Sequence, residues 1–371
     1  MPRPSYCLIF EDVGTNTGIG RVVSADLRIA LNAGYQVSVV AQNLDQEFRD
    51  HVNWLPLYVP PRGFLLKWAT ARRYMRRAIG DRKFDIVHGH QPQSIALADV
   101  FTCHFITRVA YERDCLDDRK SLRGALVRLQ QKAVLRLEDR IYRNWNPSTT
   151  MTYSSNLLER EFCRIYPAPP THTVIDNSLP VLQPATEAER LNARLRLVGT
   201  ENKLPVVGYL GGLDKRKGYQ WVIDAMAATD KLFLLMAGQY SEGYSNPKIG
   251  SRMKSLGTIR DVETFYAACD VLLVPSLFDP MPLVVLEAIA RGVPVIATEG
   301  VGNLPWLVKC NAGMEWKPGT PLEPLVNHIL NHPVEFARGR ALMAEQLSAE
   351  SRTGKLLKVY SDILERKGGN R

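Results

Sequence analysis

The order of apolar segments along the chain is the strongest constraint on its fold. Short runs rich in Val, Ile, Leu and Phe alternate with longer segments of helical spacing, the pattern of parallel sheets joined by crossover helices. Strands are expected at 6–10, 36–42, 84–90 and 99–105, and again at 204–210, 232–238, 255–259, 270–276 and 293–300. Helices are expected near 19–33, 64–79, 120–143 and 155–165, and near 218–228, 261–268, 283–291 and 321–331. The sequence therefore predicts an α/β protein with a parallel sheet in each half.

The length of the chain and a central break in this pattern predict two domains. The 371 residues exceed the roughly 250–300 at which a single hydrophobic core stops growing. Residues 177–190 interrupt the pattern with prolines and polar residues, so we interpret them as the linker. We expect one domain over 1–180, a second over 181–355 and a terminal segment, 356–371. That segment is expected to be helical, with one face that carries Leu356, Tyr360, Ile363 and Leu364.

Cysteine usage and hydropathy bear on the compartment. The six cysteines are scattered without a Cys-x-x-Cys pair, which argues against a zinc site or a disulfide framework and favours a reducing compartment. The first residues have too short an apolar run for a signal peptide, and no 18-residue apolar window occurs. We therefore expect a cytoplasmic protein with no membrane-spanning segment.

Positive charge is concentrated in two segments of this chain of net charge +9. Residues 62–83 carry eight Lys or Arg against one acid, and residues 119–143 carry eight against two. In the second segment we expect a basic stripe of Arg128, Lys132, Arg136 and Arg140 opposite an apolar face of Leu122, Leu126, Leu129 and Ala133. Two interpretations stay open, a solvated surface or peripheral docking on anionic lipid at the inner face of the plasma membrane. Nucleic acid is disfavoured, because no nucleic-acid-binding motif accompanies the charge.

Residues 279–298, DPMPLVVLEAIARGVPVIAT, carry the most specific functional signal. Pro282 suits the first turn of a helix and Gly292 its exit, so the helix is predicted to begin near Pro282. The unpaired N–H groups and the dipole at that end can hold a diphosphate. Asp279, just outside the helix, and Glu287, one turn inside it, can accept hydrogen bonds from sugar and ribose hydroxyls. The spacing predicts a nucleotide-sugar site.

A glycine-rich turn at 208–226 is the second predicted part of this site. Gly211 and Gly212 follow a strand and let the backbone approach a ligand closely. Arg216 and Lys217 come next, at the entrance of a helix, where cations can offset the charge that builds on a leaving nucleoside diphosphate.

The first half contains a similar turn between a strand and a helix. Gly18 and Gly20 lie in it, but Val23 stands where a dinucleotide-binding motif has its third glycine, and no ribose-binding acid follows the next strand. A dinucleotide cofactor is therefore disfavoured, and a purely structural turn stays an alternative.

The stretch from Pro275 to Thr298 resembles the retaining glycosyltransferases of family 4. Their motif is Glu, seven residues and Glu, followed by A-x-A-x-G-x-P-V, and Lys217-Gly218 matches a second family motif. The resemblance implies the GT-B fold, in which two Rossmann-like domains face a central cleft and a C-terminal helix crosses back to the first domain. This chain departs from the family in three places: Asp279 stands where Glu is usual, Pro282 replaces a common Gly, and Gly212 occupies the place of a common Arg.

The resemblance also implies roles for individual residues. The catalytic group would be His104, beneath the reacting sugar, with Arg216, Lys217 and Asp279. Donor contacts would come from Gly18, Gly20, Gly211, Gly212, Gly238, Gly257, Met281, Leu283, Val284 and Glu287. His90 would touch the acceptor, although a structural role is an equal alternative.

The expected activity follows from this set of residues. We expect a retaining transfer of a sugar from a nucleoside diphosphate, with UDP favoured, to a hydroxyl of a lipid-linked or surface-glycan precursor. No Asp-x-Asp or other metal-spaced cluster occurs, so the sequence predicts no metal and no cofactor. The alternatives are a GT-B epimerase or phosphorylase, and a catalytically silent sugar-nucleotide-binding or membrane scaffold protein.

Overall fold

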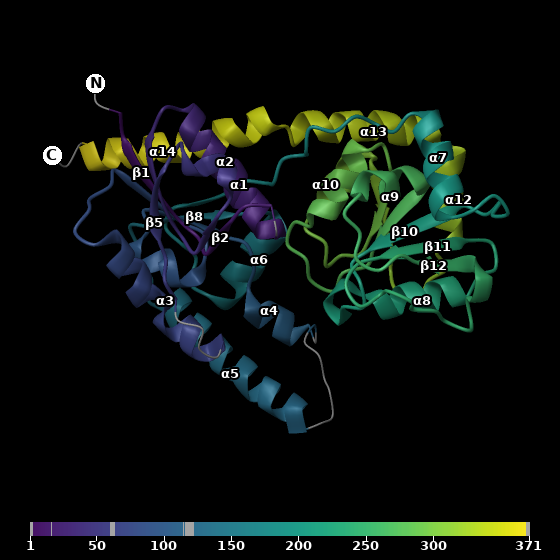
Figure 1. Ribbon diagram of the computed structural model, residues 1–371, viewed down its shortest axis with the longest axis horizontal. Helices are drawn as coiled ribbons and strands as arrows, with labels where there is room; N and C mark the ends of the chain where they lie inside the picture. The colour runs from purple at the N-terminus through teal and green to yellow at the C-terminus, as the bar shows by residue number, and fades with distance from the viewer. Residues whose placement is uncertain (1–2, 16, 60–63, 114, 116–121, 369–371) are drawn as a thin grey trace. The chain divides into compact units, whose positions relative to one another are not determined.

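The computed structural model describes residues 3–15, 17–59, 64–113, 115 and 122–368, without the side chains of 64 and 122–128. The chain divides into two compact units (Figure 1). Unit 1 comprises 1–109, 118–177 and 352–371, and unit 2 comprises 110–117 and 178–351. The boundaries thus fall at 177/178 and 351/352, where the sequence placed them at 180/181 and 355/356. The assignment of 110–117 to unit 2 was not anticipated.

Unit 1 is built on a parallel sheet of seven strands within the described residues, in the order β5-β3-β1-β6-β7-β8-β9. The strands are β1 (Ser5–Ile9), β3 (Gln36–Ala41), β5 (Asn53–Pro56), β6 (Ile86–Gly89), β7 (Val100–Cys103), β8 (Thr150–Tyr153) and β9 (His172–Val174). A small parallel pair joins β2 (Asp12–Val13) to β4 (Asn43–Leu44). The helices are α1 (Gly18–Asn32), α2 (Gln46–Arg49), α3 (Phe64–Ile79), the 3₁₀ turn η1 (Pro92–Leu97), α4 (Thr107–Glu112), α5 (Leu122–Arg143), α6 (Asn156–Ile165) and α14 (Ala349–Gly368).

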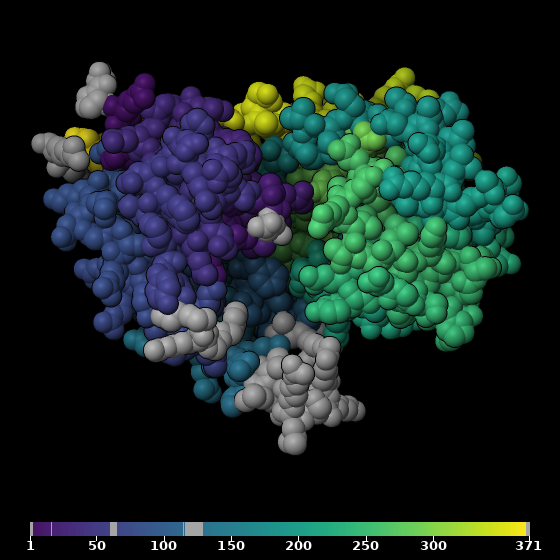
Figure 2. Space-filling view, viewed as in Figure 1, coloured from purple at the N-terminus to yellow at the C-terminus, as the bar shows by residue number. Residues whose placement is uncertain are grey.

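Both faces of the unit 1 sheet are covered by helices, as alternation along β1 requires. Tyr6 and Leu8 pack in an apolar cluster with α1 and α14, while Cys7 and Ile9 pack with α3 on the other face. Helix α5 contacts α3 (Figure 1). In the space-filling view the purple and indigo N-terminal residues cover most of the face of unit 1 that is turned to the viewer (Figure 2). The buried face of α14 in this cluster carries Leu356, Tyr360 and Ile363, as the sequence predicts.

Unit 2 has a second parallel sheet, of six strands in its described residues, in the order β12-β11-β10-β13-β14-β15. The strands are β10 (Val206–Leu210), β11 (Phe233–Ala237), β12 (Met253–Ser255), β13 (Val271–Val274), β14 (Val295–Ala297) and β15 (Gly313–Glu315). The helices are α7 (Glu187–Leu197), η2 (Lys215–Lys217), α8 (Tyr219–Ala227), η3 (Gly250–Arg252), α9 (Val262–Ala268), α10 (Leu283–Ala290), α11 (Leu304–Cys310), α12 (Glu323–Asn331) and α13 (Pro333–Gln346). Leu272 and Val274 of β13 face α9 and α10, whereas Val271 and Leu273 face α8 and α12.

Two predicted segments differ from the structure. The strand expected at 255–259 is β12, which ends at Ser255, so Gly257 lies in the loop that follows it. Residues 187–190, predicted to be linker, are the first turn of α7. That helix begins there because Thr186 and Glu189 form a capping box, in which each side chain accepts a hydrogen bond from the other residue's backbone N–H.

The two basic segments form the amphipathic helices α3 and α5. Arg72, Arg73, Arg76 and Arg77 are all exposed on α3, and Lys132, Arg136 and Arg140 are exposed on α5. The predicted apolar face of α5 is wrong at Leu129, which is 64% exposed, because a residue three positions before Lys132 shares its face. Val134 and Leu135 are buried instead. The side chains of Leu122, Leu126 and Arg128 lie outside the described residues, as do residues 62, 63 and 119–121.

Candidate active site

The predicted phosphate turn of unit 2 follows β10 at the carboxyl edge of the sheet, where ligands bind in open α/β sheets. The 3₁₀ turn η2 carries Lys215, Arg216 and Lys217, and the Asp214 side chain accepts a hydrogen bond from the Arg216 N–H at 2.9 Å. Gly218 ends the turn with φ of 72°, and a Cβ atom there would lie 1.9 Å from the carbonyl oxygen of Pro275. Glycine is therefore required by both backbone angle and space.

Asp279 lies in the loop after β13, the neighbour of β10 in the sheet. Its backbone pairs with the loop after β14, through bonds from Asp279 N–H to Gly300 O at 2.8 Å and from Gly302 N–H to Asp279 O at 2.9 Å. The Leu277 N–H donates to Arg216 O at 2.9 Å, which ties the two site loops together. The Asp279 backbone is therefore fixed by loops on both sides.

The structure brings together three of the four residues predicted to be catalytic. Lys217 Nζ donates to Asp279 Oδ2, and Arg216 Nη1 lies 3.6 Å from the same oxygen. Arg216 also donates to the carbonyl oxygen of Phe278 at 3.3 Å. Asp279 is buried and both cations are partly accessible. The carboxylate thus holds two positive groups beside the start of α10.

Helix α10 begins at Leu283, with Pro282 as its N-cap, close to the predicted start. Leu283 and Val284 are half-buried in its first turn, and Met281 is buried just before it. Glu287 is also buried, and its Oε2 accepts a hydrogen bond of 2.7 Å from the hydroxyl of Tyr266 on α9. Tyr266 was not anticipated from the sequence, and it fixes the orientation of the predicted ribose contact.

Four of the predicted donor glycines lie together at the ends of β10, β11 and β12. Gly211 N–H and Gly212 N–H both donate to Ala237 O, and Gly238 N–H donates to Gly257 O at 2.8 Å. A Cβ atom on Gly212 would lie 2.3 Å from Gln239 O, and one on Gly238 would lie 2.3 Å from Gly212 N. Contact between backbones is therefore sufficient to require glycine at 212 and 238.

A pocket of about 500 Å³ opens beside the Asp279 loop in unit 2. It is lined by Arg113, Trp221, Ser276, Leu277, Thr298, Glu299, Gly300, Glu315, Trp316, Lys317 and Pro318. No predicted donor residue is among these described lining residues. Arg113 donates to Leu277 O at 3.1 Å and its guanidinium lies over the Phe278 ring, so it supports the Asp279 loop from this side.

In unit 1 the predicted glycine loop lies at the carboxyl end of β1. Gly18 is the first residue of α1 and is exposed, and the N-cap Thr17 accepts a hydrogen bond of 2.9 Å from Gly20 N–H. Gly20 is buried, where a Cβ atom would lie 2.7 Å from Gly14 O. Gly18 is therefore accessible to a ligand, whereas Gly20 is required by the packing of the turn.

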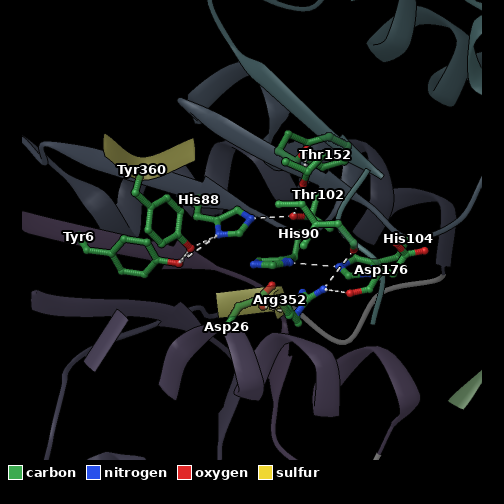
Figure 3. Close-up of polar contacts among 12 residues, drawn as sticks. Tyr6, Asp26, His88, His90, Thr102, His104, Thr152, Asp176, Arg352 and Tyr360 are labelled. Carbon is green, nitrogen blue, oxygen red and sulfur yellow. Dashed lines mark hydrogen bonds and ion pairs between the residues drawn. The ribbon is translucent and has the colours of Figure 1, made fainter. Parts of the chain in front are cut away.

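His104 and His90 follow the adjacent strands β7 and β6, and their rings bond to each other (Figure 3). His90 Nδ1 lies 3.0 Å from His104 Nε2. His104 is half-buried, but His90 is only 3% exposed and its ring packs against that of His88, tilted by 35° with 4.0 Å between centroids. This burial argues against the predicted contact of His90 with the acceptor and favours the structural alternative.

A buried polar network surrounds these histidines. His88 Nδ1 bonds to the hydroxyls of Tyr6 and Tyr360, at 3.1 and 2.8 Å, and His88 Nε2 bonds to Thr102 Oγ1 at 2.7 Å. Burial lowers the pKa of His88 and His90 well below the usual value, helped by neighbouring positive charge. Burial and Arg352 lower the pKa of His104 to about 3. All three rings are therefore neutral near pH 7.

Two family models match the chain, one in each half. The model described as a glycosyl transferase 4-like domain matches residues 17–178, and the model described as glycosyl transferases group 1 matches residues 204–331. The chain belongs to the family 4 glycosyltransferases. Its predicted family is thereby confirmed, and its activity is that of a glycosyltransferase.

Individual relatives and solved structures agree. An uncharacterized glycosyltransferase of Methanocaldococcus jannaschii is 25% identical over 312 residues, 76% of this chain and 76% of the relative. The lipopolysaccharide core biosynthesis glycosyltransferase LpsE of Rhizobium meliloti is 32% identical over 104 residues, 26% of this chain and 31% of the relative. The structure of Anabaena HepE in complex with UDP-glucose is similar with a TM-score of 0.70 and 17% identity, covering 97% of this chain and 100% of that chain. The predicted GT-B fold is confirmed.

Two residues that the sequence did not single out belong to the histidine cluster of this glycosyltransferase. Asp26 on α1 and Arg352 on α14 form a buried ion pair, with Arg352 Nη2 2.6 Å from Asp26 Oδ1. They are 326 positions apart, and neither lies in a motif. The one sequence signal was the apolar face of the terminal helix, which predicts that α14 packs but gives no polar partner.

Proposed function

We propose that this glycosyltransferase transfers a sugar from a nucleoside diphosphate, with UDP favoured, to a hydroxyl acceptor with retention of configuration and without a metal ion. The observation that carries the proposal is the convergence of Arg216 and Lys217 on the Asp279 carboxylate beside the first turn of α10. Two cations and a helix N-terminus together are suited to a diphosphate, which carries negative charge on every non-bridging oxygen.

In the proposed reaction the two cations act as the glycosidic bond breaks. Negative charge then accumulates on the departing diphosphate, and Arg216 and Lys217 stabilise it more strongly than they stabilise the bound donor. Asp279 holds the cations in place beforehand and accepts hydrogen bonds from sugar hydroxyls once the diphosphate takes over their charge. The leaving phosphate accepts the acceptor's proton, so the mechanism needs no separate general base.

Two comparisons support the choice of substrates. The similar HepE structure is a complex with UDP-glucose, which favours a uridine diphosphate sugar as the donor. The relative LpsE is named for lipopolysaccharide core biosynthesis, which favours a surface-glycan precursor as the acceptor.

We further propose that unit 1 approaches a lipid-linked acceptor through the basic faces of α3 and α5. Both helices combine exposed cations with an exposed leucine, Leu66 on α3 and Leu129 on α5, which is the composition of an interfacial helix. The helices contact each other, so their charges can act on one surface. Among helices of the described residues, none has the length and apolar content needed to cross a bilayer.

Substitution of the two cations tests the proposed donor site. Lys217→Ala and Arg216→Ala should each raise the transition-state barrier by about 2–4 kcal/mol while weakening donor binding far less. Lys248→Ala, which removes an exposed cation elsewhere in unit 2, is the matched control. The measurement is release of UDP from UDP-sugars, with and without lipid extract, beside calorimetric binding of the donor. Near-normal turnover in both site variants would contradict the assignment.

Two further measurements separate the alternatives. A silent binding protein would bind donor in calorimetry without releasing UDP in any condition. Metal independence predicts that turnover survives EDTA, so loss of activity that Mg²⁺ or Mn²⁺ restores would refute it. Glu287→Ala should weaken the binding of free UDP. Asp279→Ala should weaken the binding of the intact UDP-sugar but not that of free UDP.

A further inference from the structure

The starting observation is the way Asp26 is held inside unit 1. Its carboxylate is fully buried, and Arg352 donates to Oδ1 through both Nε at 3.0 Å and Nη2 at 2.6 Å. The guanidinium is permanently charged and equally buried, so the carboxylate stays ionised as its counter-ion. With Oδ1 occupied twice, Oδ2 has no hydrogen-bond partner among the described residues. A buried anionic oxygen in this position requires a donor.

The nearest candidate donor is the ring of His90. Its Nδ1 is bonded to His104, and its Nε2 is buried without a partner among the residues that the structure describes. Asp26 and His90 offer ligand atoms within 4.8 Å of each other, and Asp26 lies against the ring edge of His90 in Figure 3. A small side-chain rotation or a single water molecule spans such a separation. Asp26 and His90 therefore leave one acceptor and one donor position unsatisfied in the same cluster.

We propose that Asp26 and His90 are positioning residues that fix the tautomer and the orientation of His104. In this series of hydrogen bonds, Asp26 Oδ2 accepts from His90 Nε2–H and His90 Nδ1 accepts from His104 Nε2–H. His104 Nδ1 is then unprotonated and keeps its lone pair. The inference rests on the proposed function together with the place beneath the transferred sugar that the family resemblance implies for His104. It assigns His104 Nδ1 as a hydrogen-bond acceptor for a hydroxyl of that sugar.

The charges in the cluster select this direction of the chain. If His90 carried its proton on Nδ1, its Nε2 lone pair would face the Asp26 carboxylate and leave two acceptors opposed in a buried site. The low pKa of all three rings agrees, because each neutral histidine has one donor and one acceptor nitrogen. This is the arrangement by which a carboxylate fixes a histidine tautomer through the far ring nitrogen.

A metal ion is a poorer explanation of the same residues. Asp26, His88 and His90 are close enough together to suggest an ion site. However, both His88 nitrogens are already bonded to hydroxyls, and the Arg352 cation lies on the Asp26 carboxylate. A divalent cation would have to displace these bonds and approach a buried positive charge.

The first experiment determines the histidine tautomers directly and does not depend on enzyme activity. The full-length protein is labelled with ¹⁵N-histidine, and its seven histidines are assigned by single substitutions in two-bond ¹H–¹⁵N spectra. We expect protonated Nε2 and unprotonated Nδ1 in both His90 and His104. In His90→Phe, which keeps a ring in place, His104 should become a mixture of tautomers. Protonation of His90 at Nδ1, or an unchanged His104 in His90→Phe, would overturn the proposal.

The second experiment reads the consequence for turnover. His90→Phe should lower kcat for donor cleavage at least about tenfold, the usual effect of removing a residue that orients a functional histidine. Its Kd for UDP should stay unchanged, because UDP lacks the sugar. His90→Asn, which can place an amide oxygen near the position of Nδ1, should recover most of the rate. Thr152→Val, which disturbs the neighbouring Thr102 bond, is the control and should match the parent.

The proposed function and the positioning role can be refuted independently of each other. A parent protein that neither binds nor cleaves nucleotide sugars would refute the proposed function, while the spectra would still decide the Asp26–His90–His104 chain. An active parent whose His90→Phe variant has full kcat would refute the positioning role alone.

Discussion

Acidification from pH 7.0 to 5.5 should destabilise the protein through His88, His90 and His104, the three histidines of the cluster in unit 1. Each has a pKa lowered in the folded state, mainly by burial, whereas the unfolded chain titrates near 6.5. Below pH 6.5 the unfolded state therefore binds protons that the folded state does not. The stabilisation is fully present above pH 6.5 and is lost as the pH falls towards the folded pKa.

The magnitude follows from these values. For His104, with a folded pKa of about 3, the linkage relation gives a loss of about 1.2 kcal/mol between pH 7.0 and 5.5. His88 and His90 are shifted in the same direction and add to this loss, which is set against a typical stability of roughly 5–15 kcal/mol. Burial raises the pKa of Asp26 and Glu138, which acts on stability in the opposite sense.

Urea unfolding of the full chain at pH 7.0 and 5.5, followed by tryptophan fluorescence and far-ultraviolet circular dichroism, measures this effect. His104→Asn removes one titrating ring, so its loss of unfolding free energy over the interval should be about 1.2 kcal/mol smaller than that of the parent. His51→Asn changes an exposed histidine and is the control. Equal pH dependence in the parent and His104→Asn would refute the assignment of a neutral, buried His104.

Three further predictions concern the backbone and the surface. Tyr240 is 82% exposed with φ of 61°, so Tyr240→Gly should raise the free energy of unfolding by about 0.5–1 kcal/mol in urea titrations, and a decrease would contradict backbone strain there. Gly218→Ala should lower the free energy of unfolding by at least about 2 kcal/mol, because the added Cβ atom meets the carbonyl oxygen of Pro275. The control is Gly354→Ala on α14, where a Cβ atom meets open space, and it should be neutral or stabilising. Co-sedimentation with anionic vesicles should decrease as salt is added. Joint replacement of Arg72, Arg73, Arg76 and Arg77 by Gln should weaken vesicle binding by about 1 kcal/mol per cation, while donor cleavage persists. A variant that sediments like the parent would exclude α3 as the membrane contact.

The elements predicted best are those with a strong period and clear ends. Helix α3 spans 64–79 as expected, because its apolar residues recur at helical spacing. Strand β15 was not predicted, because its residues Gly313, Met314 and Glu315 include no β-branched or aromatic side chain. The start of helix α7 was not predicted, because the prolines that precede it indicate a linker. The sequence does contain Thr186 and Glu189 at the spacing of a capping box.

The proximity of Lys217 and Asp279 could be predicted because both residues follow neighbouring parallel strands. Lys217 follows β10 and Asp279 follows β13, and parallel strands bring their carboxyl ends to one edge of the sheet. Spacing within one motif could not show that Lys217 and Arg216 share the Asp279 carboxylate, because that contact joins residues 62 positions apart. The sequence left the acceptor contact and the structural role of His90 equally open, because its burial depends on packing against side chains such as that of His88 at the same strand end.

The Asp26–Arg352 pair also lies beside two of the segments through which the chain passes between the units. The chain passes to unit 2 after Asn177 and returns before Arg352, and Arg352 Nη1 donates to the carbonyl oxygens of Ile175 and Asp176 at 3.1 and 2.9 Å. One guanidinium therefore holds both crossing segments and the carboxylate that faces His90. A buried ion pair contributes little net stability compared with apolar packing. Its value here is positional, because the four hydrogen bonds of Arg352 fix the start of the linker, the first turn of α14 and the Asp26 end of the histidine cluster.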